Sequence, residues 1–370
     1  MRKMIPVNIP QIGDEEAEIV AKVLRSRVLT DRLGNGPMVK KFEKAYARFA
    51  NAKHAVAVNN GTAALHMALL AAGVNPGNEV ILPSFTFVAT AEVVAMIGAK
   101  PVFVDVNPET YNIDPQKIEE AVTAKAKAII PVDLYGLPAD METIQEMAQK
   151  HNLVVIEDAA QAHGAMYKGK PPGCFADMAC WSFYATKNMT TGEGGMVTTN
   201  DDDYAEKLRC IRSHGEKEEY RSVMMGYNYR MPEVEAAIGC AQLRKLPGFL
   251  RRRRENARLL TEILVETKRL QLPTEPRNYK HSWYLYTVRL RDADAVTRNN
   301  VVDELRKRGI GAAIYYPTPI HLMPYYRQFG KYQIPETERA AQQVFSLPVH
   351  PSVTSKEIEY IGDSVRQVLK

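Results

Sequence analysis

Cysteine is scarce in this sequence, with only four among 370 residues. None of them has the C-x-x-C spacing or the flanking histidines of a zinc site. So few, widely spread cysteines also do not form the framework of a disulfide-rich secreted domain. We therefore expect no metal site and free thiols in a reducing compartment, at Cys174, Cys180, Cys210 and Cys240.

Long hydrophobic runs are absent as well. No run reaches the roughly 18 apolar residues of a membrane-spanning helix. The first residues, MRKMIPVNIPQIGDEEAE, lack the apolar centre of a signal peptide. We expect a cytoplasmic protein that does not bind a membrane.

The excess of charge is also small. The 48 basic and 43 acidic residues leave a net charge of +5, which is evenly spread and suits an anionic small molecule better than nucleic acid. No basic helix-turn-helix pattern is visible. The densest basic run, Arg251 to Arg254, lies in a helical pattern, and we expect it to form a solvated helix face. No nucleic-acid partner is predicted.

What the sequence does contain is an alternation of short apolar runs with helical patterns. The runs lie at 54–59, 79–83, 101–106, 127–134 and 153–158, and two more follow at 177–184 and 195–199. Strands that are apolar on both faces and separated by helices form a mainly parallel sheet with helices on both faces. Ligands of such α/β sheets bind beyond the carboxyl ends of the strands. The loops after the strands are therefore where function should be sought.

The last third of the chain changes in character. A long helical pattern over about 232–266 leads to an aromatic strand at 282–290, a helix at 299–309 and a Tyr/Pro-rich loop at 314–326. This pattern is typical of a small α+β domain. We expect a large domain over 1–250, including an N-terminal arm, and a smaller C-terminal domain over 251–370.

Two segments after predicted strands could hold a planar phosphorylated ligand. In NNGTAALHMAL, Gly61 and Thr62 open a helix whose free N–H groups and dipole favour a phosphate. The alternative is that the threonine only caps the helix. In PSFTFVATA, Phe87 could lie against a planar ring, although a core position is the commoner fate of phenylalanine.

Two charged residues complete this pattern. Asp158 ends the strand LVVIED and could keep a pyridinium nitrogen protonated, whereas Glu157 should point to the opposite face. The alternative for Asp158 is a helix cap. Lys187 stands between a strand and the turn GEGG, where a desolvated amine could form a Schiff base, and its alternative is a solvated loop position. Together these features describe a site for pyridoxal 5′-phosphate (PLP).

Six segments carry a resemblance that runs nearly from end to end. NGTAAL, PSFTFVAT, EDAAQAHGA, SFYATKNMTTGEGG, GYNYRMPEVEAAIG and SLPVHP resemble motifs of the PLP-dependent nucleotide-sugar aminotransferases of the DegT type. The resemblance implies the aspartate-aminotransferase-like fold, called fold type I. It also implies a homodimer with active sites shared between subunits, and pyridoxamine phosphate (PMP) as an intermediate form of the cofactor.

The matching motifs also imply roles for single residues. Lys187 resembles the lysine that forms the internal aldimine and moves the proton, and Asp158 resembles the partner of the pyridinium nitrogen. Gln161 stands where the family contacts the 3′ oxygen of the ring, and Asn228 matches an asparagine that reaches the phosphate from the neighbouring subunit. The phosphate cradle corresponds to Gly61, Thr62, Ala63 and Ser182, and the stacking ring to Phe87.

The implied reaction moves an amino group from L-glutamate to a keto group of a nucleotide-linked sugar, for surface polysaccharide or another glycan. Tyr316 and His321 resemble a family loop on the sugar side of the site. This chain has Tyr315 where family members often carry histidine, so any role of that histidine is absent or moved. Arg230 could hold a carboxylate or diphosphate, and a surface role fits it equally well.

Three alternatives remain open. The acceptor could be a cyclitol or another ketone without a nucleotide. A PMP-dependent sugar dehydratase of the same fold would carry histidine in place of Lys187, which disfavours that activity. A non-catalytic regulatory protein could retain the fold, although the intact set of site residues argues against this.

Overall fold

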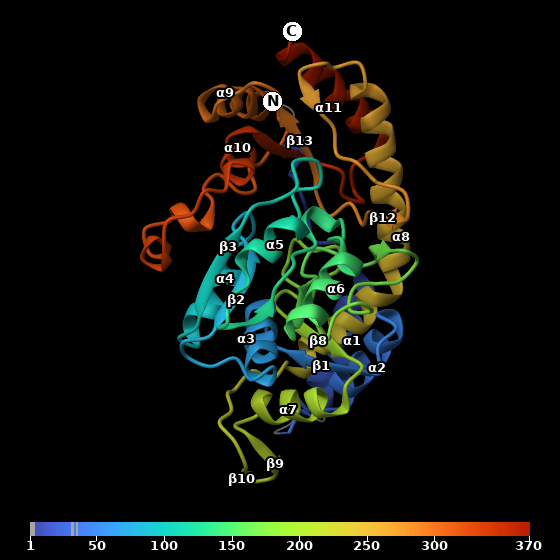
Figure 1. Cartoon of the computed structure of the whole chain (residues 1–370). Coiled ribbons are helices and arrows are strands. Elements are labelled where there is room, and N and C mark those ends of the chain that lie inside the picture. Colours follow the sequence, from blue (N-terminus) through green and yellow to red (C-terminus); the bar gives the residue numbers. More distant parts are fainter. Residues whose placement is uncertain (1–3, 31–32, 35) are drawn as a thin grey trace.

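The computed structural model describes residues 4–30, 33–34 and 36–370 (Figure 1). Its centre is a seven-stranded sheet in the order β1-β8-β7-β5-β4-β2-β3. The neighbours from β7 to β3 run parallel, while β8 is antiparallel to both β1 and β7. This architecture confirms the predicted α/β fold with a mainly parallel sheet. The strands are β1 (His54–Val58), β2 (Glu79–Pro83), β3 (Lys100–Val104), β4 (Ala126–Ile129), β5 (Val154–Asp158), β7 (Met178–Ser182) and β8 (Gly195–Thr199).

Helices cover both faces of this sheet. Because successive side chains of a strand alternate, Val56 and Val58 of β1 enter one core and Ala55 and Ala57 enter the other. On the first face lie α3 (Gly61–Ala71), α4 (Ala89–Met96) and α7 (Asp202–Arg212). On the second lie α2 (Pro37–Phe49), α5 (Pro115–Ala121), α6 (Met141–His151) and α8 (Glu233–Leu264), with α1 (Asp14–Ser26) packed on α8.

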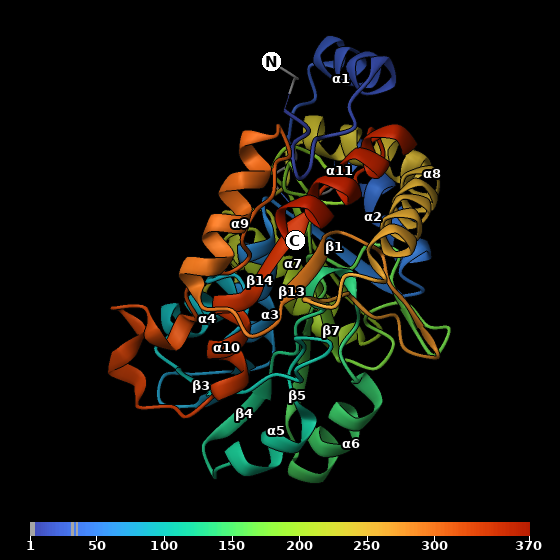
Figure 2. The same cartoon turned by 90° about the horizontal axis from the view of Figure 1, so that it is seen from above.

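The C-terminal part has its own apolar core around an antiparallel sheet. The helix α8 contributes to this core and to that of the large sheet, and it packs along α11 (Figure 2). Ile5 also enters this core, so the N-terminal segment crosses to the C-terminal part. The elements here are β11 (Leu270–Gln271), β13 (Tyr286–Leu290), α9 (Ala295–Lys307), α10 (Pro335–Gln343), β14 (Val344–Leu347) and α11 (Ser355–Val368).

Several bounds differ from the sequence prediction. The strand expected at 282–290 begins only at Tyr286, because Trp283 has a left-handed backbone (φ 54°) that interrupts an extended chain. The helix expected at 299–309 begins earlier, because the Asp294 side chain accepts the Thr297 N–H at 2.8 Å and caps it there.

The remaining elements are short. A hairpin of β9 and β10 projects at the bottom of Figure 1. None of the helices in the described ranges is both long enough and apolar enough to span a membrane. The short elements are β6 (Met166–Tyr167), β9 (Glu216–Glu218), β10 (Arg221–Ser222) and β12 (Tyr279–Lys280), with 3-10 turns at Leu134–Gly136, Ile320–Leu322 and Tyr326–Phe329.

Candidate active site

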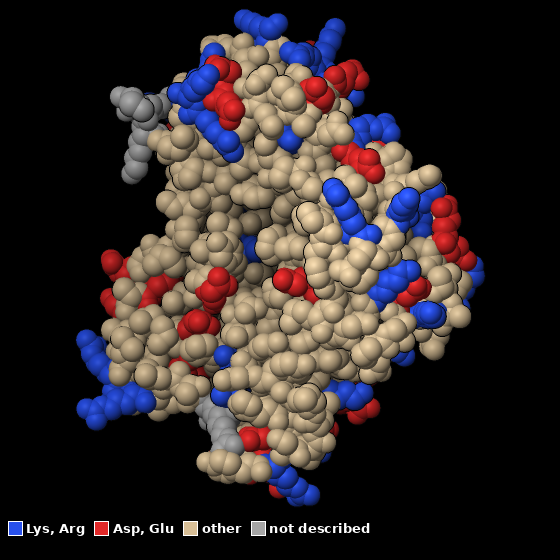
Figure 3. All heavy atoms as spheres, turned by 90° about the vertical axis from the view of Figure 1, so that its left-hand side faces the viewer, with Lys and Arg blue, Asp and Glu red and all other residues tan. Residues whose placement is uncertain are grey.

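A cavity of about 820 Å³ lies at the carboxyl ends of β5 and β7. The starts of α3 and α4 form one wall, and tyrosines of the C-terminal part close the other. Figure 3 shows the molecule hollowed near the centre of one face, with mostly uncharged side chains around the hollow. Nine residues predicted from the sequence line the cavity: Gly61, Thr62, Ala63, Phe87, Asp158, Gln161, Ser182, Lys187 and Tyr316.

The start of α3 has the features of an anion site. The side chain of Asn60, not of Thr62, caps the helix by accepting the Ala63 N–H at 2.7 Å. Among the described residues, no acceptor takes the N–H groups of Gly61 or Thr62. A Cβ on Gly61 would lie 2.8 Å from that of Ser182, so glycine is what lets this hydroxyl approach the helix. A phosphate fits here, held by backbone N–H groups and a serine.

Asp158, the last residue of β5, faces the cavity and is 6% exposed. Its carboxylate accepts hydrogen bonds from Thr90 Oγ1 at 2.9 Å and from the Ala160 N–H at 3.2 Å. Burial raises the pKa of Asp158, while these bonds and the charge of Lys187 act in the opposite direction. No helix follows β5, so the capping alternative is wrong. A buried carboxylate of this kind needs a cation, and a protonated pyridine nitrogen fits that need.

Glu157 points away from the cavity, as predicted. It accepts the Gly173 N–H at 2.5 Å on the other face of the sheet. Burial raises the pKa of Glu157 to about 7, and burial together with the charge of Glu157 raises the pKa of Asp133. Of the two neighbouring carboxylates Glu157 and Asp158, only Asp158 can therefore contact a ligand in the cavity.

Lys187 lies in the loop between β7 and β8 and is half-buried rather than deeply desolvated. Its backbone N–H donates to the Tyr184 carbonyl at 2.9 Å. Its side-chain nitrogen lies 4.7 Å from the centroid of the Tyr284 ring. His163 is fully buried, and burial, together with the charge of Lys187, lowers the pKa of that histidine to about 3. Lys187 thus lines the cavity, and the imidazole of His163 is uncharged.

Two aromatic residues and an amide complete the cavity. Gln161 Oε1 accepts the Tyr135 N–H at 2.7 Å, and its Nε2 donates to the Tyr316 hydroxyl at 3.2 Å. Phe87 is 55% exposed, so it is not the core residue of the alternative interpretation. Its ring centroid lies 6.2 Å from that of Tyr316. A planar ring could enter beside Phe87, within reach of the Gln161 amide.

Three predicted residues do not line the cavity. His321 is buried elsewhere, with Nδ1 2.8 Å from Ser84 Oγ and Nε2 3.3 Å from Glu338, so it ties the end of β2 to α10. The geometry gives it no contact with a ligand in the cavity. Asn228 is exposed, and Arg230 donates to Ser213 Oγ at 3.0 Å. Both lie on the segment that follows the β9–β10 hairpin.

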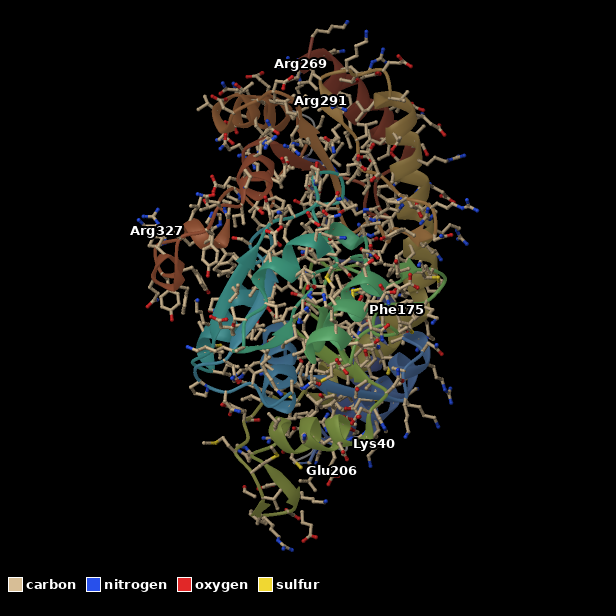
Figure 4. All side chains as sticks on the ribbon, in the orientation of Figure 1. Lys40, Phe175, Glu206, Arg269, Arg291 and Arg327 are labelled. Atoms are coloured by element: carbon tan, nitrogen blue, oxygen red, sulfur yellow. The ribbon has the colours of Figure 1, made fainter. Side chains whose placement is uncertain are left out.

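Other lining residues were not predicted from the sequence. His66 Nδ1 lies 3.1 Å from the Tyr229 hydroxyl, and Glu193 lies in the GEGG turn. The signal for Tyr229 was present in GYNYRM, next to a predicted residue. Lys187 is the only Lys or Arg among the described residues that line the cavity. The arginines labelled in Figure 4, Arg269, Arg291 and Arg327, lie on outer parts of the molecule.

The sequence profile of the DegT/DnrJ/EryC1/StrS aminotransferase family matches residues 10–366. The chain belongs to this family. A pleiotropic regulatory protein of Geobacillus stearothermophilus is 43% identical over 96% of this chain and 95% of its own length. GDP-perosamine synthase of Caulobacter vibrioides is 40% identical over 99% and 98%. A UDP-N-acetyl-3-dehydro-α-D-glucosamine 3-aminotransferase of Acidithiobacillus ferrooxidans is 42% identical over 90% and 89%.

Solved structures agree with the family. DesV of S. venezuelae superposes with a TM-score of 0.91 at 36% identity, over 96% of this chain and 94% of that one. Spr1654 of Streptococcus pneumoniae has structures in a PMP form and in a PLP form, and each superposes with a TM-score of 0.92 over 99% of this chain and 98% of its own. The sequence identity is 30% for the PMP form and 29% for the PLP form. The chain is thus a PLP-dependent aminotransferase of the aspartate-aminotransferase-like fold, and its relatives indicate a sugar acceptor.

Proposed function

We propose that this aminotransferase moves an amino group from L-glutamate to a keto group of a nucleotide-linked sugar, in the cytoplasm, for a surface polysaccharide or another glycan. The observation that carries the proposal is one cavity holding Lys187, Asp158 and the anion site of α3. Two relatives, at 40% and 42% identity, have names that describe amino-group chemistry on GDP-linked and UDP-linked sugars. The amino donor and the nucleotide are part of this proposal.

The cavity residues bind and orient the cofactor. Bound PLP supplies the electron sink that makes transfer of an amino group possible. Gly61 and Thr62, with the Ser182 hydroxyl, would hold the phosphate, and Ala63 completes this turn of the helix. Asp158 would keep the ring nitrogen protonated by its negative charge. Gln161 would contact the ring through its side-chain amide, and Phe87 would contact it through its aromatic ring.

Lys187 would hold the aldehyde end of the resting cofactor. Once the amino donor has displaced it, its Nζ would take the proton from the α-carbon of the donor as general base and give it to carbon C4′ of the cofactor as general acid. With the sugar ketone it runs the same transfer in reverse. The uncharged His163 puts no second positive charge near the lysine.

The site is shared between two copies of the chain in this proposal. A donor with two carboxylates and an acceptor with a diphosphate need cations, and Lys187 is the only Lys or Arg that the described residues bring to the cavity. The β9–β10 hairpin and the segment after it expose large apolar side chains, among them Tyr220 (81%) and Met225 (80%). Such a surface fits burial in a homodimer. The same segment carries Asn228 and Arg230, which would reach the partner's cavity.

Two other functions have specific support. The relative at 43% identity is named as a pleiotropic regulatory protein, which keeps a regulatory role in view. A cyclitol ketone would also fit a cavity that is lined by few charges. Both predict a different result in the following experiment.

The experiment converts the enzyme to its PMP form with L-glutamate and removes the donor. It then adds nucleotide-linked 3-keto and 4-keto sugars with uridine, guanosine or thymidine, and a cyclitol ketone as the matched control. We expect one nucleotide sugar to restore the PLP absorption of the enzyme. Mass spectrometry should then show that the keto oxygen of this sugar has been replaced by an amino group. A reaction with the cyclitol alone, or with no ketone, would overturn the proposal.

A further inference from the structure

The sequence predicted that the run from Arg251 to Arg254 in α8 forms a solvated helix face. The structure shows that this is wrong for Arg253, which is buried. Arg254 pairs with Glu275 at 2.7 Å and remains partly exposed. Arg253 is 2% exposed, and no carboxylate in the described part of the chain forms an ion pair with it. Burial lowers the pKa of Arg253 to about 10. A buried guanidinium without a counterion is costly unless its hydrogen bonds are well used.

Those hydrogen bonds lead toward the cavity. Arg253 donates through Nη1 to the carbonyl oxygens of Trp283 and Tyr284, each at 3.2 Å. Its Nη2 donates to Asn8 Oδ1 at 2.8 Å. The Nδ2 of Asn8 then donates to the Thr186 carbonyl at 2.5 Å. The N-terminal segment thus links α8 to the residue that directly precedes Lys187.

Tyr284 closes this network from the other side. Its hydroxyl lies 3.1 Å from Thr186 Oγ1, and its ring faces the Lys187 nitrogen at 4.7 Å. Arg253 therefore holds the backbone of Tyr284 directly, and through Asn8 it holds the loop that carries the lysine. The same guanidinium is thus connected to the segment that carries the ring and, through Asn8, to the loop that carries the amine.

We propose that Tyr284 is a positioning residue for Lys187, with Arg253 and Asn8 keeping its ring in register with the lysine loop. A lysine side chain has many rotamers, and restricting them costs conformational entropy. The attraction between a cation and an aromatic face offsets this cost and favours the rotamer that lies over the ring. The ring thus keeps the amine at the cavity whenever it is not bonded to the cofactor. This inference rests on the role proposed above for Lys187.

The first test follows bond formation in the apoenzyme rather than turnover. PLP is added to cofactor-free protein, and the rate at which its aldehyde bonds to Lys187 is read from the absorption change. We expect Tyr284→Leu to slow this rate about 5- to 30-fold, the factor that corresponds to 1–2 kcal/mol. Tyr284→Phe keeps the ring and should stay within about twofold of the wild type. Equal rates in Tyr284→Leu and the wild type would overturn the inference.

Pyridoxine 5′-phosphate, which has no aldehyde and cannot bond to the lysine, separates positioning from cavity shape. Its dissociation constant should be nearly the same in the wild type and in Tyr284→Leu. A loss of its affinity as large as the loss of rate would mean that Tyr284 only shapes the cavity. Lys187→Ala should give no bond formation. If Lys187→Ala gave the wild-type absorption change, the proposed role of Lys187 would be wrong. This outcome is distinct from a failure of the positioning role of Tyr284, in which only Tyr284→Leu behaves like the wild type.

The network itself is tested with neighbouring arginines. Arg253→Met should slow bond formation, whereas the matched control Arg254→Met should not. If Arg253→Met does not fold, Asn8→Ala carries the test, because Asn8 is only half-buried and lies near the chain start. Asn8→Ala should slow bond formation in the same direction. A rate equal to that of Arg254→Met would remove Arg253 and Asn8 from the proposal.

Discussion

The Thr90 hydroxyl is fully buried and donates a 2.9 Å hydrogen bond to Oδ2 of Asp158. Thr86 Oγ1 lies 3.3 Å from the same hydroxyl. Phe87 stands between these threonines in the sequence, at the mouth of the cavity. One segment therefore supports the carboxylate from behind and offers an aromatic ring in front. Its geometry should affect how strongly the cofactor is held.

Replacing Thr90 with valine keeps the shape of the side chain but removes this hydrogen bond. Hydrogen bonds to charged groups contribute about 1.5–3 kcal/mol. We expect Thr90→Val to raise the pKa of Asp158 further and to weaken PLP binding at least about 10-fold, measured by equilibrium titration of the apoenzyme. Thr90→Ser should restore most of the affinity. Wild-type affinity in Thr90→Val would contradict the orienting role.

Asp158→Asn should separate stability from activity. Because a neutral amide cannot keep the ring nitrogen protonated, we expect the cofactor to bind and activity to fall by about 10² or more. Because burial raises the pKa of Asp158, its protonated form is favoured on folding, and that stability is lost as pH rises through the raised value. Each pKa unit between the folded and the unfolded state lowers the free energy of unfolding by about 1.4 kcal/mol once the carboxyl is ionised in both states.

The variant apoenzyme should therefore melt at a higher temperature than the wild type at pH 8. The difference should shrink as the pH falls toward the ordinary pKa range of an aspartate, where the wild-type carboxyl is protonated as well. Thermal denaturation of both cofactor-free proteins across this range measures the effect. If the Asp158→Asn apoenzyme melted below the wild type at pH 8, burial would not be destabilising the ionised carboxylate as proposed.

Glu157→Gln concerns the carboxyl pair on the other face of the sheet. The folded pKa of Glu157 is about 7, and its main cause is burial. The stability from its protonated form is fully present below the ordinary glutamate pKa and is lost as the pH rises through about 7. We expect the wild-type melting temperature to fall between about pH 5 and 7.5 and the variant to fall less. Parallel curves for the two proteins would show that Glu157 does not titrate in this window.

Mixed dimers test whether the site is shared. A heterodimer of Lys187→Ala and Asn228→Ala subunits holds one intact site if Asn228 acts in the partner's cavity. Random mixing makes about half the dimers mixed, so about a quarter of wild-type activity should appear from two inactive proteins. The measurement is turnover of the mixture after subunit exchange. No activity above the sum of the parents would count against Asn228 acting across the interface.

Much of the central sheet could be predicted, because its strands are continuous apolar runs that end at loops. The alternation of side chains along a strand put Asp158 and Glu157 on opposite faces, but only the resemblance of EDAAQAHGA to a family motif indicated that Asp158 is the one that faces the cavity. The antiparallel direction of β8 was not predicted. No helix separates β7 from β8, so the chain returns through the Lys187 loop instead of crossing over in parallel.

The remaining site residues depend on contacts between distant segments. Asn8, Arg253 and Tyr284 meet only because the N-terminal segment, α8 and the C-terminal part converge behind the lysine loop. No local pattern marks such residues, and a run of four arginines even suggested solvent exposure. For His321 the error is the reverse, because a sequence motif indicated a place in the site that the structure does not give it. A motif placed it near the sugar, but Ser84 and Glu338 hold its ring outside the cavity.

The most direct test is the visible absorption spectrum of the purified protein with PLP, recorded before and after adding L-glutamate, beside that of Lys187→Ala. The account predicts a yellow band that glutamate converts to the pyridoxamine band in the wild type, and neither the lysine-bonded band nor the conversion in the variant. A wild-type protein that stays colourless with PLP would contradict the account. So would a variant that reproduces the wild-type spectra.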